Sequence, residues 1–409
     1  MYSSSIIARN VSRANRNLAK PLVRHASEVA AKWVAHLASL IDKEGKLKRP
    51  LRSEERDFIR NETILSKLDF LYWCSRYCCI EMDAMEGGGL GKLCPWESQR
   101  ILLAHLASRE EACYAAFDRG EPVDGILVAD HKGGRQVGHT GIARALIIHR
   151  MVFYHYTRAM GGTVDDDKKQ ELYDRDKIIL DNLPWWMRPS LKYDTKAGQI
   201  ELAEIGSRQL YQVASQAGGI GQGRQFDVSH ITEVASFEGV TRGNPTRLEY
   251  EFFPALPQSR HTLCILESTA NGRGNWWHDF TERVRLGQMH RWSYCFIPWY
   301  AEPRKYRRTP PVNWQPKLTT FAHAKYVHET SPEFLSGRTV SLAPDNLYWW
   351  ETSREEAIAR GTLNIFLTNY AATPSESFQH SSRSAFDAAL LSELRSETSV
   401  APAYEIVGV

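Results

Sequence analysis

The sequence predicts an α/β fold with a mostly parallel central sheet, preceded by a helical region and followed by a second helical part. Between about residues 93 and 299, short apolar runs alternate with stretches of helical periodicity, which is the pattern that βαβ units produce. One of these runs leads directly into a glycine-rich turn and an apolar helix. The chain has 409 residues, enough for two or three domains with a sizeable core.

The N-terminal and central elements follow from composition and periodicity. Residues 1–60 are polar and basic, with helical periodicity from Ser27 to Leu40, and residues 62–80 are apolar and aromatic, which favours a helix packed on the main body. The glycine-rich segment 86–91 is typical of a flexible joint, so we place a boundary there. Apolar runs predict strands at 126–130, 209–214, 227–231, 262–267 and 293–297.

The C-terminal part of the chain differs in composition. Residues 301–320 are rich in proline and basic residues, which favours a linker or an extended arm. Residues 345–400 have the pattern of helices, with a loop around Thr373-Pro374. We therefore divide the chain into a basic, helical N-terminal region (1–90), an α/β core (91–300) and a basic arm with a helical subdomain (301–409).

The charge is small overall and uneven along the chain. The net charge is +3, whereas residues 1–60 carry 13 lysines and arginines against 6 acids, which gives +7. A second basic cluster runs from Arg304 to Arg308. Both segments suit contact with phosphate or an acidic partner, and both also suit a solvated surface. No apolar run has the length of a membrane span, and the seven cysteines lack zinc-site spacing, which favours reduced thiols.

The most informative motif is the segment Gly133-Gly134-Arg135-Gln136-Val137-Gly138-His139-Thr140. It lies between the first predicted strand and an apolar helix from Ile142 to Met151, where backbone N–H groups and a helix N-terminus bind phosphate. Both glycines have the spacing of the pattern G-x-x-x-x-G-K-S/T, and Thr140 offers a hydroxyl to Mg²⁺. His139 occupies the lysine position, so the positive charge must come from Lys132 or Arg135. An ordinary glycine-rich turn is the alternative.

Polar residues also end two other predicted strands. The run Phe226 to Glu233 ends in an acid, which suits the activation of a water molecule, whereas Thr232 stands where an aspartate is usual. Metal binding there would go through water or rely on Thr140. A run from Leu263 ends in small polar residues that suit the sensing of a γ-phosphate, namely Ser268, Thr269 and Asn271. A surface glutamate and a plain strand-to-turn transition are the alternatives.

Upstream, Trp96 and Gln99 have side chains that suit stacking on an adenine and hydrogen bonding to it. These pieces, in this order, resemble the large terminase subunit of tailed bacteriophages, the ATPase motor that packages DNA into empty capsids. The segment P-W-x-x-Q resembles the family's adenine motif, and G-R-Q-V-G-H-T resembles its phosphate loop without the standard lysine. H-I-T-E-V-A is similar to its second acidic motif, and E-S-T-A-N-G to its coupling motif. The resemblance spans roughly residues 90–390.

The resemblance implies a P-loop NTPase core that uses ATP and Mg²⁺ to translocate double-stranded viral DNA. The implied partners are the portal protein of the procapsid, the small terminase subunit and further copies of the chain in a ring. The implied location is the host cell cytoplasm, without a membrane and not in the mature virion. Glu233 is then the catalytic carboxylate, Thr140 and Thr232 the metal side chains, and Arg224 a candidate arginine for a neighbouring subunit's site. ATP binding falls to Trp96, Gln99, Lys132, Gly133, Gly134, Arg135, Gln136, Val137, Gly138, His139 and Thr140.

Two departures from the family pattern matter. In many relatives a lysine stands where this chain has Gly133, and Lys132 lies one residue before that position. Relatives continue into an RNase H-like nuclease domain, whereas this chain stops at Val409, about where that domain would begin. We therefore expect endonuclease activity only in a longer form, this chain being truncated or the product of a split gene. The alternative functions are a helicase-like nucleic-acid ATPase and a scaffold with a degenerate loop that does not hydrolyse ATP.

Overall fold

The computed structural model describes residues 21–83, 86–194, 198–214, 220–221, 223–239 and 245–378. They form two compact units. Unit 1 takes in Met1–Asp130, Gln136–Ser268 and Arg283–Cys295, and unit 2 takes in His131–Arg135, Thr269–Glu282 and Phe296–Val409, as far as these segments are described. Predictions for the first twenty residues and for residues 379–409 lie outside the described part. Among the helices described, none has both the length and the apolar character that crossing a membrane requires.

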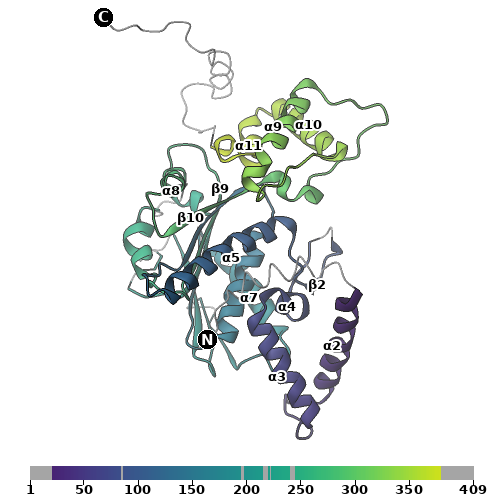
Figure 1. Cartoon of the computed structure of the whole chain (residues 1–409), viewed down its shortest axis with the longest axis vertical. Coiled ribbons are helices and arrows are strands. Elements are labelled where there is room, and N and C mark those ends of the chain that lie inside the picture. Colours follow the sequence, from purple (N-terminus) through teal and green to yellow (C-terminus); the bar gives the residue numbers. More distant parts are fainter. Residues whose placement is uncertain are drawn as a thin grey trace, which may run out of the picture. The chain divides into compact units, whose positions relative to one another are not determined.

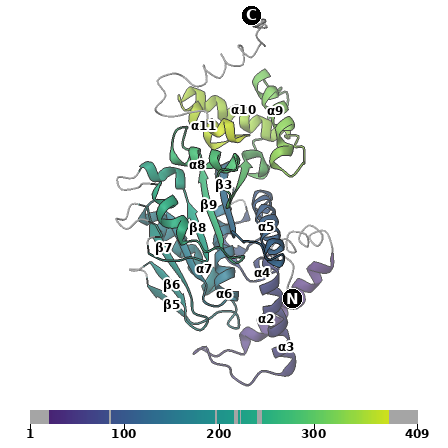
Figure 2. The same ribbon diagram turned by 60° about the vertical axis from the view of Figure 1, so that its left-hand side comes forward.

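Unit 1 is built on a sheet in which the described strands follow the order β10-β3-β9-β8-β4-β7-β6-β5. β4 runs parallel to β7 and to β8, and β8 runs parallel to β9, whereas β5, β6 and β7 are antiparallel neighbours. Figure 2 shows β9, β8 and β7 in succession, with β6 and β5 beyond them. The predicted α/β fold with a mostly parallel sheet is confirmed. The strands are β3 (Ile126–Gly133), β4 (Arg158–Thr163), β5 (Leu191–Asp194), β6 (Gln199–Leu202), β7 (Ser207–Val213), β8 (Val228–Thr232), β9 (Leu263–Thr269) and β10 (Trp292–Pro298).

All five predicted strands are present, but the sequence missed β4 in the middle of the sheet. Its residues, Arg-Ala-Met-Gly-Gly-Thr, include two glycines and no β-branched residue before the last, so the usual strand signal is weak. The glycines are needed for packing. A Cβ at Gly162 would lie 3.1 Å from the side chain of Ile231, and one at Gly161 would lie 3.3 Å from the Arg144 guanidinium. The strand is therefore specified by its neighbours and not by its own propensity.

Helices α6 (His139–Phe153) and α7 (Asp166–Asp181) pack on each other and on the middle strands, and α4 (Phe70–Arg76) and α5 (Glu97–Asp118) pack on α6. The predicted helix after the glycine-rich turn is confirmed as α6, which is buried on nearly all sides. Its polar side chains have buried partners. Arg144 forms an ion pair with Asp176, and Arg150 Nη2 lies 2.6 Å from Glu110 Oε1. Pairing removes much of the cost of burying these charges, so α6 keeps a fixed position under the sheet.

The N-terminal part of unit 1 begins with α2 (Pro21–Ser39) and α3 (Ser53–Leu68), which lie side by side (Figure 1). The helix expected from Ser27 is confirmed as part of α2. The helix predicted at 62–80 is wrong in its bounds: α3 starts earlier, Asp69 caps a separate α4, and a hairpin of β1 (Cys79–Glu81) and β2 (Leu90–Lys92) follows. The glycine-rich segment lies in the turn of that hairpin, and the compact units have no boundary there.

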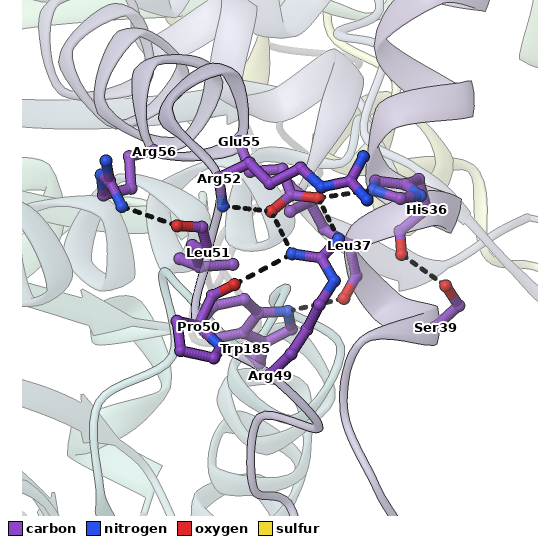
Figure 3. A network of polar contacts seen from close by, with 10 residues as sticks. All are labelled: His36, Leu37, Ser39, Arg49, Pro50, Leu51, Arg52, Glu55, Arg56 and Trp185. Carbon is purple, nitrogen blue, oxygen red and sulfur yellow. Dashed lines mark hydrogen bonds and ion pairs between the residues drawn. The ribbon is translucent and has the colours of Figure 1, made fainter.

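A buried carboxylate joins α2 to α3 (Figure 3). Glu55 is 1% exposed and accepts hydrogen bonds from Arg49 Nη2 at 2.6 Å, Arg49 Nη1 at 2.9 Å, His36 Nε2 at 2.8 Å and the Arg52 backbone N–H at 2.6 Å. The bonds from Arg49, His36 and Arg52 hold the pKa of Glu55 far below its usual value. The carboxylate therefore stays charged and is matched by the Arg49 guanidinium, which fixes the two helices together.

Unit 2 contains α9 (Leu318–Phe334), α10 (Pro344–Ala359), α11 (Leu363–Asn369) and α12 (Pro374–Ser377), of which the first three are gathered together in Figure 1. The helices expected after residue 345 are confirmed as far as the chain is described. The buried indole of Trp299 packs on the rings of Trp349 and His323, with centroids 5.3 and 5.9 Å away. Other helical elements of the chain are 3-10 or π turns and α8, namely Val234–Gly239, Leu248–Phe252, Phe253–Ala255, α8 (Trp276–Arg285), Trp299–Ala301 and Pro303–Lys305.

Candidate functional site

The phosphate-loop candidate follows β3, which runs further than predicted. Lys132 and Gly133 are still part of the strand, so the turn itself covers only Gly134 to Gly138 before α6 begins. Residues 131–135 belong to unit 2, where the Gly133 carbonyl accepts a hydrogen bond of 2.7 Å from the Ala371 backbone N–H. The Tyr306 hydroxyl donates to the carbonyl of Arg135, whose side chain is exposed. The backbone of this half of the loop is thus held in place while the Arg135 guanidinium faces solvent.

The second half of the loop, in unit 1, is shaped by Gly138. This residue has a φ of 75°, and a Cβ there would lie 2.5 Å from Gln99 Nε2 and 3.1 Å from the Trp96 ring. Only glycine meets both the conformation and the space. Gln99 Nε2 donates to the Gly138 carbonyl at 2.7 Å, and its Oε1 accepts from the Trp96 backbone N–H at 2.8 Å. The structure therefore brings both residues of the expected adenine motif onto the loop, with the Gln99 amide bracing its backbone.

His139, at the usual lysine position, is turned into the protein. Its ring is 1% exposed, with Nδ1 lying 2.7 Å from Asp130 Oδ2 and Nε2 3.2 Å from the Ser98 carbonyl oxygen. A carbonyl oxygen only accepts, so Nε2 carries a proton. The imidazole joins β3 to the start of α5, and any positive charge on it is matched by Asp130. This geometry suits support of the loop and does not suit contact with a phosphate.

Thr140, in the first turn of α6, is linked to a buried glutamate. Its hydroxyl donates to Glu267 Oε1 at 2.8 Å, and the other oxygen of Glu267 lies 2.7 Å from His230 Nε2. The side chains of Glu267 and His230 are completely buried. Residues from α6, β9 and β8 thus meet in one network at the start of the helix.

Thr232 and Glu233 end the acidic strand β8. Thr232 is the register partner of Glu267 in β9, and register partners in parallel strands project to the same face of the sheet. His230, two residues earlier in β8, lies on that face too, which is the face that α6 covers. Thr232 is 5% exposed. The hydroxyl that replaces the expected aspartate therefore lies beside the Glu267 carboxylate.

Glu233 has a backbone conformation that few non-glycine residues adopt, with a φ of 58°. Such positions persist where the surrounding structure holds them and are common at functional sites. Its side chain is half-buried. The hydrogen bond to Glu171 raises the pKa of Lys168, and the charge of Glu233 adds to that rise. The carboxylate of Glu233 thus lies near the first turn of α7 and is not held in the buried network of Glu267.

The predicted coupling residues fall in two places. In unit 1, Ser268 Oγ accepts a hydrogen bond of 3.0 Å from the backbone N–H of Ala235, two residues after Glu233. Thr269 and Asn271 belong to unit 2, where the Asn271 carbonyl accepts from Asn275 Nδ2 at 2.7 Å. A hydrogen bond therefore connects the end of β9 to the turn that carries the acid.

Arg224 lies at the opposite ends of the strands from Glu233, just before β8. Its exposed side chain lines a hollow of about 180 Å³ together with Arg158 and Arg208. Arg158 Nη2 is paired with Asp227 Oδ1 at 2.7 Å. This arginine-lined hollow suits an anion.

Sequence reasoning missed three residues of the site: Glu267, Asp130 and Ser98. A signal existed for the first two, because each is an acid within an apolar run that predicts a buried strand. Buried acids need partners, so both positions predict a contact, although the partner is not readable from spacing. Ser98 contributes its backbone carbonyl to His139 and its hydroxyl to the carbonyl of Val137, and no sequence pattern marks such contacts.

No protein-family model and no curated protein matches the chain. Its structure is similar to solved structures of large terminases. That of bacteriophage HK97 has a TM-score of 0.46 and 10% identity, covering 74% of this chain and 54% of that one. The ATPase domain from Thermus phage P74-26 has a TM-score of 0.35 and 11% identity, covering 55% and 90%. A large terminase from a thermophilic bacteriophage in complex with ATP-gamma-S has 0.31 and 11%, covering 53% and 48%. This chain spans about half the length of the HK97 protein.

Proposed function

We propose that this chain is the ATP-hydrolysing part of a motor that moves double-stranded DNA into a viral procapsid. The observation that carries the proposal is the contact of Thr140 with Glu267, beside the strand end that leads to Glu233. It places a hydroxyl at a helix N-terminus, a buried acid and a half-buried acid along one edge of a parallel sheet. Open α/β sheets bind ligands at such an edge, and helix N-termini bind phosphates.

Mg²⁺ is the metal ion that fits these residues. The Thr140 hydroxyl gives its proton to Glu267, so the lone pairs of its oxygen remain for a cation. In the described segments no three His, Cys, Asp or Glu side chains form a metal cluster. This fits Mg²⁺, which takes most of its ligands from phosphates and water in such enzymes. When bound, the ion would bridge the β- and γ-phosphates and neutralise their charge.

The other residues take roles that follow from their places. Glu233 orients the attacking water, and Lys132 or Arg135 neutralises phosphate charge. Loss of the γ-phosphate is sensed at Ser268, Thr269 and Asn271, and the Ser268 bond to Ala235 supports a link between that sensor and the acid. Arg224 reaches the nucleotide of a neighbouring copy, so that a ring of subunits on the portal protein fires in order. The small terminase subunit delivers the DNA.

The hydrolytic role is tested with Glu233→Gln, which keeps the size of the side chain and removes its charge. We expect ATP binding to persist and turnover to fall by about 10²-fold or more, the usual scale for a general base. Glu238→Gln, an exposed carboxylate in the following turn, is the matched control. Near-normal turnover in the Glu233 variant would sink the assignment. A parent protein that binds ATP without turnover would favour the scaffold alternative.

The role in DNA transport is tested separately at the basic cluster. Arg304 Nε lies 2.7 Å from Glu302 Oε1, Arg308 Nη1 lies 3.0 Å from Glu356 Oε1, and Arg307 pairs with Asp345. These arginine side chains are 43–59% exposed, and exposed pairs hold weakly, so a phosphate competes with the acids. Replacing Arg304, Lys305, Arg307 and Arg308 with alanine should flatten the salt dependence of duplex binding, by roughly one unit of slope for each phosphate that is no longer neutralised. An unchanged slope in filter binding would remove this cluster from the DNA surface.

A further inference from the structure

The phosphate-loop site lacks an acid where phosphate-loop enzymes usually have one. In such enzymes the loop Ser or Thr and an aspartate at the end of the acidic strand together hold Mg²⁺. Here β8 ends in Thr232, which carries no charge. A buried acid is nevertheless present one strand away, because Glu267 is the register partner of Thr232 in β9. The charge has the same height in the sheet and the same face as the missing aspartate.

We propose that Glu267 supplies the carboxylate of the magnesium site, shifted from β8 to β9, and positions Thr140 for the metal. The inference rests on the proposed ATP site and names a residue of that site that the sequence motif does not contain. Glu267 acts through another group, because its Oε1 holds the Thr140 hydroxyl at 2.8 Å. That bond fixes the direction of the hydroxyl proton and leaves the oxygen lone pairs for the cation.

The burial of Glu267 supports a charge-related role. The residue has 0% exposure, and burying a carboxylate costs free energy that hydrogen bonds only partly recover. A glutamine in its place would accept from Thr140 and contact His230 with the same shape and without the charge. A structural tie between α6, β9 and β8 therefore does not by itself need an acid, whereas a divalent cation beside Thr140 does.

The contact with His230 supports a fixed orientation of the carboxylate. His230 Nε2 lies 2.7 Å from Glu267 Oε2, so each oxygen of Glu267 has its own partner, from a different element. Residues that hold a metal-site group in this way usually change metal affinity by about 10- to 100-fold when they are replaced. The same scale applies to the removal of the Glu267 charge.

The test uses the full chain and a fluorescent ADP, titrated with Mg²⁺ and also in EDTA. In the parent protein, ADP binding should strengthen as Mg²⁺ is added. In Glu267→Gln, the half-saturating Mg²⁺ concentration should rise by about 10- to 100-fold while the affinity in EDTA stays the same. Glu55→Gln, a buried carboxylate far along the chain, is the control and should leave the Mg²⁺ requirement unchanged.

A rescue variant uses the strand register. Thr232→Asp combined with Glu267→Gln returns the acid to β8 and should restore the Mg²⁺ requirement of the parent to within about threefold, well inside the range set by the removal of a metal-site partner. If Glu267→Gln does not fold, the double variant decides, because it keeps one carboxylate in the pair. A Mg²⁺ requirement at least tenfold above that of the parent in the folded double variant overturns the proposal.

The outcomes separate this inference from the proposed function. Mg²⁺-dependent ADP binding in the parent with an unchanged requirement in Glu267→Gln overturns the inference and leaves the ATP site in place. A parent protein that binds no nucleotide, with or without Mg²⁺, overturns both. A raised requirement in Glu267→Gln that the double variant reverses supports the assignment of Glu267 as a positioning residue.

Discussion

Glu55 and Glu267 are both buried in unit 1, in very different surroundings. Glu55 joins two N-terminal helices and lies against a guanidinium that binds both of its oxygens. Glu267 joins α6 to the sheet and is held by a hydroxyl and an imidazole. The first carboxylate is matched by a cation that the chain itself provides. The second is placed beside a helix N-terminus and a hydroxyl, where a bound cation would match it.

The difference separates a structural acid from a functional one without reference to motifs. A matched buried pair makes a fixed joint, because removing one partner leaves the other charged and uncompensated. A carboxylate held by hydroxyl and imidazole groups keeps its shape when the charge is removed, and loses instead its attraction for a cation. Stability is therefore the property to measure for Glu55, and ligand affinity and turnover are the properties to measure for Glu267.

The largest expected effect contrasts the two acids directly. Glu267→Gln should lower ATP turnover by about 10- to 100-fold and change the thermal midpoint little. Glu55→Gln should keep turnover and lower the thermal midpoint by roughly 5 °C, because Arg49 loses its partner. The measurements are steady-state ATP hydrolysis and thermal unfolding on the same preparations. Turnover abolished in Glu55→Gln, or unfolding advanced equally in both variants, would break the contrast.

A second prediction places His139 on the structural side. His139→Ala leaves Asp130 buried without its imidazole, so the thermal midpoint should fall by roughly 5 °C. Its ATP affinity should fall by less than that of Arg135→Ala, for which we expect about a tenfold loss, the worth of one hydrogen bond to a charged group. A nucleotide-binding titration decides, and the opposite ranking would show that the histidine replaces the missing lysine.

The smallest effect concerns a third acid, Glu376 in unit 2. Burial raises its pKa from 4.5 to about 7, against the effect of hydrogen bonds from the Ala372 and Thr373 backbone N–H groups. A raised folded pKa means that its contribution to stability is complete below about pH 4.5 and is lost as the pH rises through about 7. The thermal midpoint of the parent should therefore fall by a few degrees more than that of Glu376→Gln between about pH 5 and 8. Parallel pH profiles for the two proteins would contradict this.

The parts of the fold that the sequence predicts are those with a local signal. The apolar run Ile126 to Ala129 predicts a strand buried on both faces, and the structure confirms it as β3. β4 has no such signal, because Gly161 and Gly162 make room for Arg144 and for Ile231, residues that lie elsewhere in the sequence. Its position in the sheet is decided by packing and cannot be predicted from its own six residues.

The site divides in the same way. The glycine at 138, the hydroxyl of Thr140 and the acid at 233 follow from motif spacing. The partner of Thr140 does not, because Glu267 lies 127 residues further along the chain and meets it only through the register of three strands. The environment of His139 is also beyond sequence reasoning: its low charge at neutral pH follows from the chemistry of imidazole, whereas its turn toward Asp130 depends on the fold.

The pairing of Thr232 with Glu267 also bears on how such a site changes during evolution. Because the two positions are neighbours in the sheet, an acid can move between them without any shift of the backbone. The order of substitutions is restricted: a chain with neither acid loses the cation, whereas a chain with both retains it and titrates the two groups as a coupled pair. We therefore expect related sequences to carry an acid at one of the two positions or at both, and to show covariation between them.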